Sequence, residues 1–186
     1  MNLDLSNKKV IITGGSTGIG KEVVTLFATN GAKVAIFDVN DTEGIELTNQ
    51  LNKDGHEIRY WHVDVRDSNQ VSGGVMAAEQ WLEGVDILIN LAGILQGASI
   101  NIEEFPDEIW DSVVGINLTG SYLMVKHVSN YMIKQKKGVI ILTSSGAGVL
   151  GGSSSYAYGS SKGGVCLLYT SPSPRDATLS RMPSSA

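Results

Sequence analysis

Cysteine is almost absent from the sequence, since Cys166 is the single one in 186 residues. A lone cysteine excludes both a disulfide framework and a metal site built on cysteine ligands. The three histidines, at positions 56, 62 and 127, do not have the spacing of metal ligands either, so no metal site is expected. No hydrophobic run approaches the ~18 residues of a membrane span, and the amino terminus has no apolar signal segment. We therefore expect a cytoplasmic protein without a membrane partner.

Clusters of positive charge are also missing. The chain has 14 Lys and Arg residues against 19 Asp and Glu residues, a formal net charge of −5, and no basic block. Nucleic acids are bound by concentrated basic faces, so no nucleic-acid partner is expected. The length fits one domain with a sizeable core.

What the sequence does contain is a regular alternation of two patterns. Short runs rich in Val and Ile, typical of buried strands, cover 8–13, 32–38, 57–64, 85–93 and 137–145. Apolar residues at helical spacing cover 19–30, 42–53, 68–83 and 107–136. This alternation predicts an α/β fold, a doubly wound (Rossmann) parallel sheet with helices on both faces. Functional residues are then expected where the strands end.

Local signals mark the ends of the helices. Thr42 and Asp67 stand where helix N-caps belong, and Gly31, Gly55 and Gly84 follow the expected helix ends. Glycine at that place is typical of a left-handed cap.

A glycine-rich turn follows the first expected strand. The segment TGGSTGIG, residues 13–20, lies between an apolar strand and a helix. Glycines there let the backbone turn tightly and approach a pyrophosphate at the helix N-terminus. Glycine also serves ordinary turns, but this position favours a phosphate-binding loop.

Asp38 ends the second expected strand, 18 residues after Gly20. A carboxylate at about this offset can accept hydrogen bonds from the adenosine ribose and would repel a 2′-phosphate. No arginine stands in the loop at 14–18 or directly after Asp38. The sequence therefore favours NAD over NADP, although Asp38 could also be an ordinary turn residue.

Three further strand ends carry candidate residues. Asp64 and Val65 follow the third strand, and NLAG, residues 90–93, follows the fourth, where small residues would admit adenine and its ribose. Tyr158 and Lys162 follow the fifth strand at a spacing of four, which places them on one helix face. An ammonium beside a phenol favours the phenolate, which makes Tyr158 a candidate acid or base. Taken alone, such a pair is usually packing.

In combination, these motifs resemble the short-chain dehydrogenase/reductase family in its short single-domain branch, from Lys8 to Val165. The matching elements are TGGSTGIG (13–20), Asp38, DV (64–65), NLAG (90–93), Asn117 of INLTG, Ser145 of TSSGAG and YGSSK (158–162). Asn90-Leu91 replaces the more usual Asn-Asn of the family.

The resemblance implies a catalytic set. Tyr158 would be the general acid/base, Lys162 would bind the nicotinamide ribose, Ser145 would polarise the reacting oxygen, and Asn117 would hold a relay water. Tyr156 and Ser144 are neighbouring alternatives; Tyr156 has no lysine four residues on, and the family's interval to the tyrosine falls on Ser145. The implied cofactor-binding residues are Thr13, Gly14, Ser16, Thr17, Gly18, Ile19, Gly20, Asp38, Asp64, Val65, Asn90, Ala92, Gly93, Tyr158 and Lys162.

The expected function is hydride transfer between NAD(H) and a small secondary alcohol or ketone, possible substrates including the 3-oxoacyl group of a carrier protein. A non-catalytic dinucleotide-binding regulator is the alternative from another class, and an intact catalytic set disfavours it. A sugar-nucleotide epimerase ranks lower, because its glycine turn is normally TGxxGxxG rather than TGxxxGxG. The resemblance also implies that the full-length form is a homo-oligomer, paired through the helices near 107–136 and from 158 onward.

Composition changes after Val165. Residues 166–186 contain no glycine, although the preceding residues contain 22, and they hold three of the four prolines. CLLYTSPSPRD resembles a transposase-based sequencing adapter read as codons. We therefore expect residues 1–165 to be an incomplete NAD(P)-binding domain without its last strands, and 166–186 to be a disordered, non-native tail that leaves the chain inactive. A genuine tail produced by a truncating splice or frameshift is the alternative.

Overall fold

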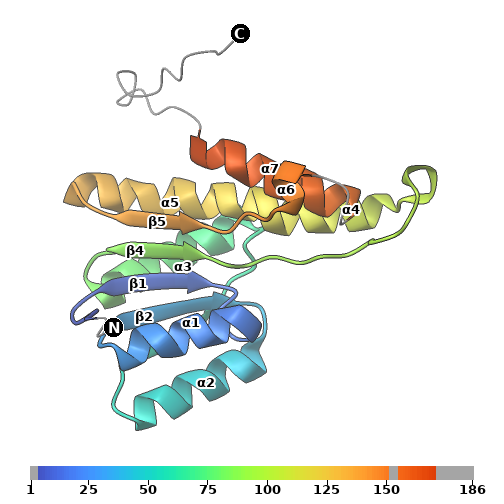
Figure 1. Cartoon of the computed structure of the whole chain (residues 1–186). Coiled ribbons are helices and arrows are strands. Elements are labelled where there is room, and N and C mark those ends of the chain that lie inside the picture. Colours follow the sequence, from blue (N-terminus) through green and yellow to red (C-terminus); the bar gives the residue numbers. More distant parts are fainter. Residues whose placement is uncertain (1–3, 151–154, 171–186) are drawn as a thin grey trace.

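A five-stranded parallel sheet forms the centre of the computed structural model, which describes residues 4–150 and 155–170 (Figure 1). The strands lie in the order β3-β2-β1-β4-β5, and all neighbouring pairs are parallel. Their bounds are β1 (Lys9–Thr13), β2 (Lys33–Asp38), β3 (Ile58–His62), β4 (Ile87–Asn90) and β5 (Val139–Leu142). The five strands expected from the sequence are all present, and the doubly wound α/β fold is confirmed.

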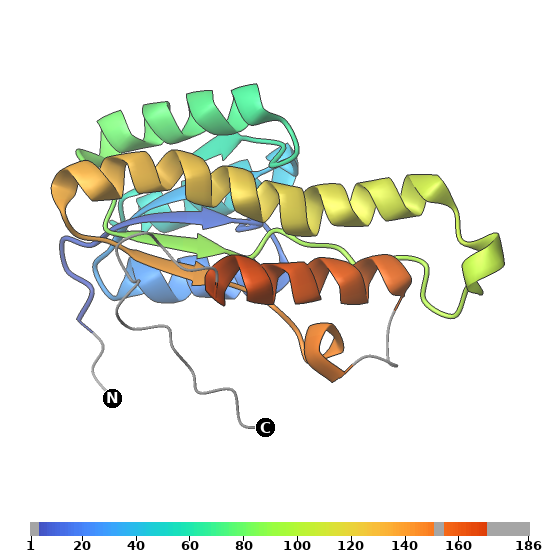
Figure 2. The same cartoon turned by 90° about the horizontal axis from the view of Figure 1, so that it is seen from above.

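Helices connect the strands and cover both faces of the sheet (Figure 2). They are α1 (Gly18–Thr29), α2 (Asp41–Lys53), α3 (Ser68–Leu82), α4 (Asp107–Val114), α5 (Gly120–Gln135), α6 (Ala147–Leu150) and α7 (Tyr156–Thr170). A 3₁₀ turn η1 (Ile102–Glu104) precedes α4, and the π-helical segment η2 (Gly115–Thr119) joins α4 to α5. Within the described residues, no helix is both long enough and apolar enough to cross a membrane.

Alternate residues of β1, β2 and β4 enter two separate apolar cores, whereas Val139 and Ile141 of the edge strand β5 are exposed. In β1, Ile11 packs on the α3 and α5 side, whereas Val10 and Ile12 pack on the α1 and α2 side. All three side chains are fully buried. A strand covered on both faces must be apolar throughout, which explains the continuous Val and Ile runs of the sequence. Each such side chain contributes about 1.5–3 kcal/mol through burial.

The expected helix ends are mostly confirmed. The Asp67 side chain caps α3 by accepting from the backbone N–H groups of Asn69 and Gln70. Gly31 and Gly55 have positive φ angles, as a left-handed cap requires, whereas at the end of α3 the left-handed residue is Glu83, one position before Gly84. Thr42 was the wrong cap for α2, because the helix starts at Asp41 and Asn40 is its N-cap.

The single helix expected over 107–136 is interrupted. Its two α-helical parts are joined by η2, where the hydrogen bonds are wider than those of an α-helix. The apolar periodicity of the sequence does not reveal one wide turn, because the apolar residues on either side of it still recur at helical spacing. Such π segments often occur at functional sites.

Helix α7 lies alongside the α4–α5 rod (Figures 1 and 2) and contacts α4, η2 and α6. It runs on to Thr170, five residues beyond the boundary expected at Val165. The Cys166 Sγ lies 3.0 Å from the Ser144 hydroxyl group. Residues 166–170 are therefore helical, unlike the disorder expected for them, while residues 171–186 of the expected tail lie outside the described residues.

The strand order places a topological switch point at the centre of the sheet. From β1 the chain first builds outward through β2 and β3, and then returns to place β4 on the other side of β1. The carboxyl ends of β1 and β4 diverge into loops on opposite sides, which opens a crevice there.

Candidate active site

The turn between β1 and α1 requires glycine, because a side chain at Gly14 or Gly20 would collide with the neighbouring backbone. Gly14 has φ +66°, and a Cβ there would lie 2.9 Å from the backbone nitrogen of Ala92. A Cβ on Gly20 would overlap the carbonyl oxygen of Gly14. Gly18 has φ +52° and open space where its Cβ would be. The turn thus leaves room for a ligand in front of the N-terminus of α1, as a pyrophosphate would need.

A cleft of about 500 Å³ opens at the switch point. It extends from the glycine turn past the ends of β2 and β3 to Ile94 and Thr143. Ten residues predicted to bind the cofactor line it: Gly14, Thr17, Gly18, Ile19, Gly20, Asp38, Asp64, Val65, Ala92 and Gly93. The residues expected at the strand ends are far apart in the sequence, but they line the same cleft.

Two other predicted residues hold the floor of the cleft without lining it. The Thr13 hydroxyl group donates to the Asn90 side chain at 3.0 Å and accepts from the backbone N–H groups of Leu91 and Ala92 at 3.1 Å. The Asn90 side chain in turn donates to Ser121 at 2.9 Å. Thr13 and Asn90 are both buried. They tie the ends of β1 and β4 together and so fix the position of the NLAG loop.

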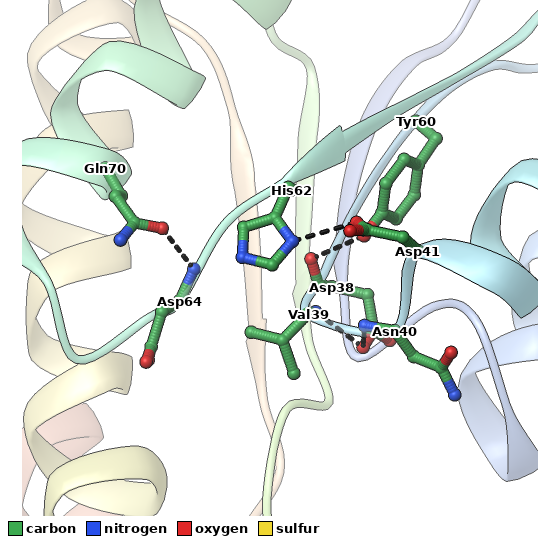
Figure 3. Close-up of polar contacts among 8 residues, drawn as sticks. All are labelled: Asp38, Val39, Asn40, Asp41, Tyr60, His62, Asp64 and Gln70. Atoms are coloured by element: carbon green, nitrogen blue, oxygen red, sulfur yellow. Dashed lines mark hydrogen bonds and ion pairs between the residues drawn. The ribbon is translucent and has the colours of Figure 1, made fainter.

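Asp38 lines the cleft with a carboxylate whose orientation is fixed by three backbone donors. Its Oδ1 accepts from Val39 at 2.8 Å and from Asn40 at 3.1 Å (Figure 3), and its Oδ2 accepts from Ser16 at 2.9 Å. Ser16 thus acts through its backbone, while its buried hydroxyl group has no hydrogen-bond partner in the structure and lies toward Gly44 of α2.

Arg66 is a residue of the cleft wall that the sequence did not reveal. Its guanidinium group donates to both oxygens of Asp64, with Nη2 2.6 Å from Oδ2. This hydrogen bond, together with the positive charge, holds the pKa of Asp64 below its usual value. The sequence argument concerns arginine in the glycine turn or directly after Asp38. Arg66 instead stands two residues after Asp64.

Lys162 is 5% exposed and lies beyond the far end of the cleft. Its ammonium group donates to the carbonyl oxygen of Thr143 at 2.8 Å and stands 5.7 Å from the centre of the Tyr158 ring. Burial lowers the pKa of Lys162, because it disfavours the charged form. The predicted pair therefore shares one face of α7, next to the end of β5.

Asn117 is fully buried in the π segment and bridges two elements. Its Oδ1 accepts from the backbone N–H of Ile94 at 2.8 Å, and its Nδ2 donates to the Ile94 carbonyl at 3.0 Å and to the Ser161 hydroxyl at 3.1 Å. Both Asn117 and Lys162 lie beside Gly93, whose Cβ would come 3.2 Å from Asn117 Oδ1 and 3.5 Å from Lys162 Nζ.

The neighbouring serines after β5 have different contacts. The Ser144 hydroxyl group donates to the backbone carbonyl of Lys162 at 2.7 Å. This hydrogen bond joins the end of β5 to α7. The Ser145 hydroxyl group accepts only weakly, from the Ala147 N–H at 3.2 Å. Tyr156 packs edge-to-face on Phe105, with ring centres 5.7 Å apart. The hydroxyl group of Ser144 is thus more fully engaged than that of Ser145, and the Tyr156 ring is engaged in packing.

Comparison with known proteins identifies the family. A family model described as short chain dehydrogenase matches residues 8–173. The chain belongs to the short-chain dehydrogenase family. Within the described parts of the chain, no group of three or more His, Cys, Asp or Glu side chains could hold a metal ion.

Several members of the short-chain dehydrogenase family are similar over most of this chain. (+)-Borneol dehydrogenase 1 of Salvia officinalis is 40% identical over 167 residues, which cover 90% of this chain and 63% of the relative. Xanthoxin dehydrogenase of Arabidopsis thaliana is 36% identical over 166 residues, covering 88% and 58%. The crystal structure of NAD⁺-bound xylitol dehydrogenase is 32% identical, with a TM-score of 0.84, and the match covers 89% of this chain and 64% of that one. The chain therefore spans less than two thirds of the length of these relatives.

Proposed function

We propose that the cleft binds NAD(H) and that the protein interconverts a secondary alcohol and a ketone, with Tyr158 as the general acid/base. The observation that carries the proposal is the placement of Lys162. Its ammonium group is held by the Thr143 carbonyl at the end of the cleft and stands 5.7 Å from the Tyr158 ring. A dinucleotide reaching from the glycine turn to Thr143 would end beside this pair.

Each polar residue has a separate task in the proposed reaction. The nicotinamide supplies the hydride chemistry when NAD(H) is bound. Tyr158 passes a proton to or from the substrate oxygen, and the ammonium of Lys162 favours the phenolate. Ser145 donates a hydrogen bond to the same oxygen, where negative charge develops. Asn117 Oδ1 accepts one hydrogen bond, from the N–H of Ile94, and an amide oxygen can accept two, so its second position is proposed to hold a water next to Lys162.

The charges of the cleft support NAD rather than NADP. Asp38 presents a carboxylate in a fixed orientation, and a 2′-phosphate near it would be repelled. Arg66 is the lining residue that could compensate, but Asp64 already engages its guanidinium group from both oxygens. A 2′-phosphate would therefore have to break an existing ion pair.

The segment that packs on Tyr156, two residues before Tyr158, favours a small alcohol or ketone over an acyl group delivered by an acidic carrier protein. Phe105, which packs on Tyr156, belongs to a segment with five carboxylates and no Lys or Arg: Glu103, Glu104, Asp107, Glu108 and Asp111. Like charges at an interface disfavour association. The names of the similar dehydrogenases, borneol and xylitol among them, also refer to small alcohols.

The Tyr158→Phe variant tests the proposal directly. The turnover measurement needs the full-length form, because residues 1–165 are expected to be an incomplete domain. In that form we expect Tyr158→Phe to lose about 100-fold or more in turnover of a secondary-alcohol panel, while NADH binding, followed by fluorescence titration, stays within about twofold because the ring remains. Tyr156→Phe is the matched control and should keep its turnover. Undiminished turnover in Tyr158→Phe would exclude the assigned role, and NADH binding without turnover in the full-length form would favour the non-catalytic regulator.

A further inference from the structure

Three side chains meet behind the turn that presents Asp38, and the proposed reaction uses none of them. Asp41 begins α2, while Tyr60 and His62 stand two residues apart on β3. The Tyr60 hydroxyl group lies 2.7 Å from Asp41 Oδ1, and His62 Nδ1 lies 2.8 Å from the same oxygen. Figure 3 shows this cluster beside the Asp38–Asn40 turn.

The Tyr60 hydroxyl group connects the cluster to the turn. It lies 2.9 Å from the backbone carbonyl of Asp38 as well as 2.7 Å from Asp41 Oδ1, and it has one hydrogen to share between them. Burial, and then the hydrogen bond to Asp41, raises the pKa of Tyr60, so the hydroxyl group remains a donor. Hydrogen bonds from Tyr60 and then His62 lower the pKa of Asp41, which keeps this acceptor charged.

The Tyr60 ring also fixes α2 against the glycine turn. A Cβ on Gly44 would overlap the ring and would lie 2.7 Å from the Ser16 hydroxyl oxygen. Ser16 is the residue whose backbone N–H binds the Asp38 carboxylate. Both ends of the Asp38 turn are therefore held, one by the glycine turn and the other by the cluster.

We propose that Asp41 and His62 are positioning residues for the adenosine end of the cofactor, acting through Tyr60 on the turn that carries Asp38 and Val39. Val39 lines the cleft, whereas Asp41, Tyr60 and His62 do not. This inference rests on the proposed binding of NAD(H) in the cleft. It makes cofactor affinity dependent on the hydrogen bonds that Asp41 accepts from His62 and Tyr60.

ADP-ribose is the suitable probe, because it contains the adenosine end and lacks the nicotinamide. Its Kd is to be measured by calorimetry on the full chain. His62→Ala removes the donor to Asp41 and should raise the Kd about threefold. His62→Gln keeps a neutral donor and should stay within about twofold of the unsubstituted chain.

Two further variants complete the test. Asp41→Asn should raise the Kd about fivefold, whereas Glu43→Gln, in the same helical turn, and His56→Gln, at the opposite end of β3, should behave as the unsubstituted chain. If ADP-ribose does not bind the unsubstituted chain, the proposed function and this inference both fall. If it binds, and His62→Ala and Asp41→Asn leave the Kd unchanged, only the positioning role falls. A higher Kd in Asp41→Asn that only parallels lost thermal stability would also overturn it.

Discussion

The hydroxyl group of Ser144 donates to the backbone carbonyl of Lys162 at 2.7 Å and so joins the end of β5 to the helix that carries Tyr158. Its neighbour Ser145 has only a weak local contact, with the N–H of Ala147. The two adjacent serines therefore differ: Ser144 holds α7, and we propose that Ser145 meets the substrate.

Alanine substitutions at these serines should have opposite effects. Ser144→Ala removes a bond to α7 and should lower the free energy of unfolding by about 1 kcal/mol. Ser145→Ala should leave stability nearly unchanged and lower turnover about 100-fold, as loss of an oxyanion donor does. Denaturant unfolding and steady-state turnover of both variants check the pair, and a fall in turnover confined to Ser144→Ala would reverse the assignment.

Gly148 allows α6 to contact α7 closely. A Cβ at this position would lie 2.5 Å from the backbone nitrogen of Gly163 and from the carbonyl carbon of Lys162. Gly148→Ala must push α6 away and should cost about 1–3 kcal/mol of stability, with a loss of turnover because Ser145 precedes α6.

Gly146→Ala is the matched control for this contact, since nothing lies within 4 Å of its Cβ position. It should change stability by no more than about 0.5 kcal/mol. Urea unfolding of both variants measures the difference, and equal effects at the two positions would show that the α6–α7 contact does not matter.

Burial of Lys162 makes stability depend on pH. Its pKa is lowered in the folded protein, so between the folded and unfolded pKa values the unfolded chain binds more protons. The contribution of Lys162 to the free energy of unfolding is therefore lowest at neutral pH. It rises as the pH increases from the folded to the unfolded pKa of this group. The Lys162→Met variant removes the group without shortening the side chain.

The Lys162→Met comparison isolates this effect from all other titrations. As the pH rises above neutral, the free energy of unfolding of the unsubstituted chain should increase relative to that of Lys162→Met. Thermal or urea unfolding of both proteins over a pH series measures the difference, and a gap that is constant with pH would contradict it.

Much of the fold was available from the sequence because the three inner strands, β1, β2 and β4, are covered on both faces. They are therefore unbroken apolar runs that mark their own positions. The glycine turn was equally visible, since the geometry at Gly14 and Gly20 admits no other residue. The wide turn at Gly115–Thr119 was not, because it keeps the apolar spacing of the helices on either side.

The site was predictable in part. Rules based on strand ends found the residues of the cleft, but they do not distinguish a side chain that lines it from one that supports it, as Thr13, Ser16 and Asn90 do. The pairing of Arg66 with Asp64, and of His62 with Asp41, depends on side-chain directions in the turn after β3 and at the start of α2. No spacing rule encodes those directions.

The π segment has a consequence for the rod formed by α4 and α5. A π turn is equivalent to one residue inserted into an α-helix, and one residue corresponds to a rotation of about 100°. The two halves of the rod are thus out of phase, and they contact different neighbours: α4 packs on α7, whereas α5 packs on α3 and β4. A single inserted residue thus lets one continuous rod pack against the core of the sheet along α5 and against the helix of Tyr158 along α4.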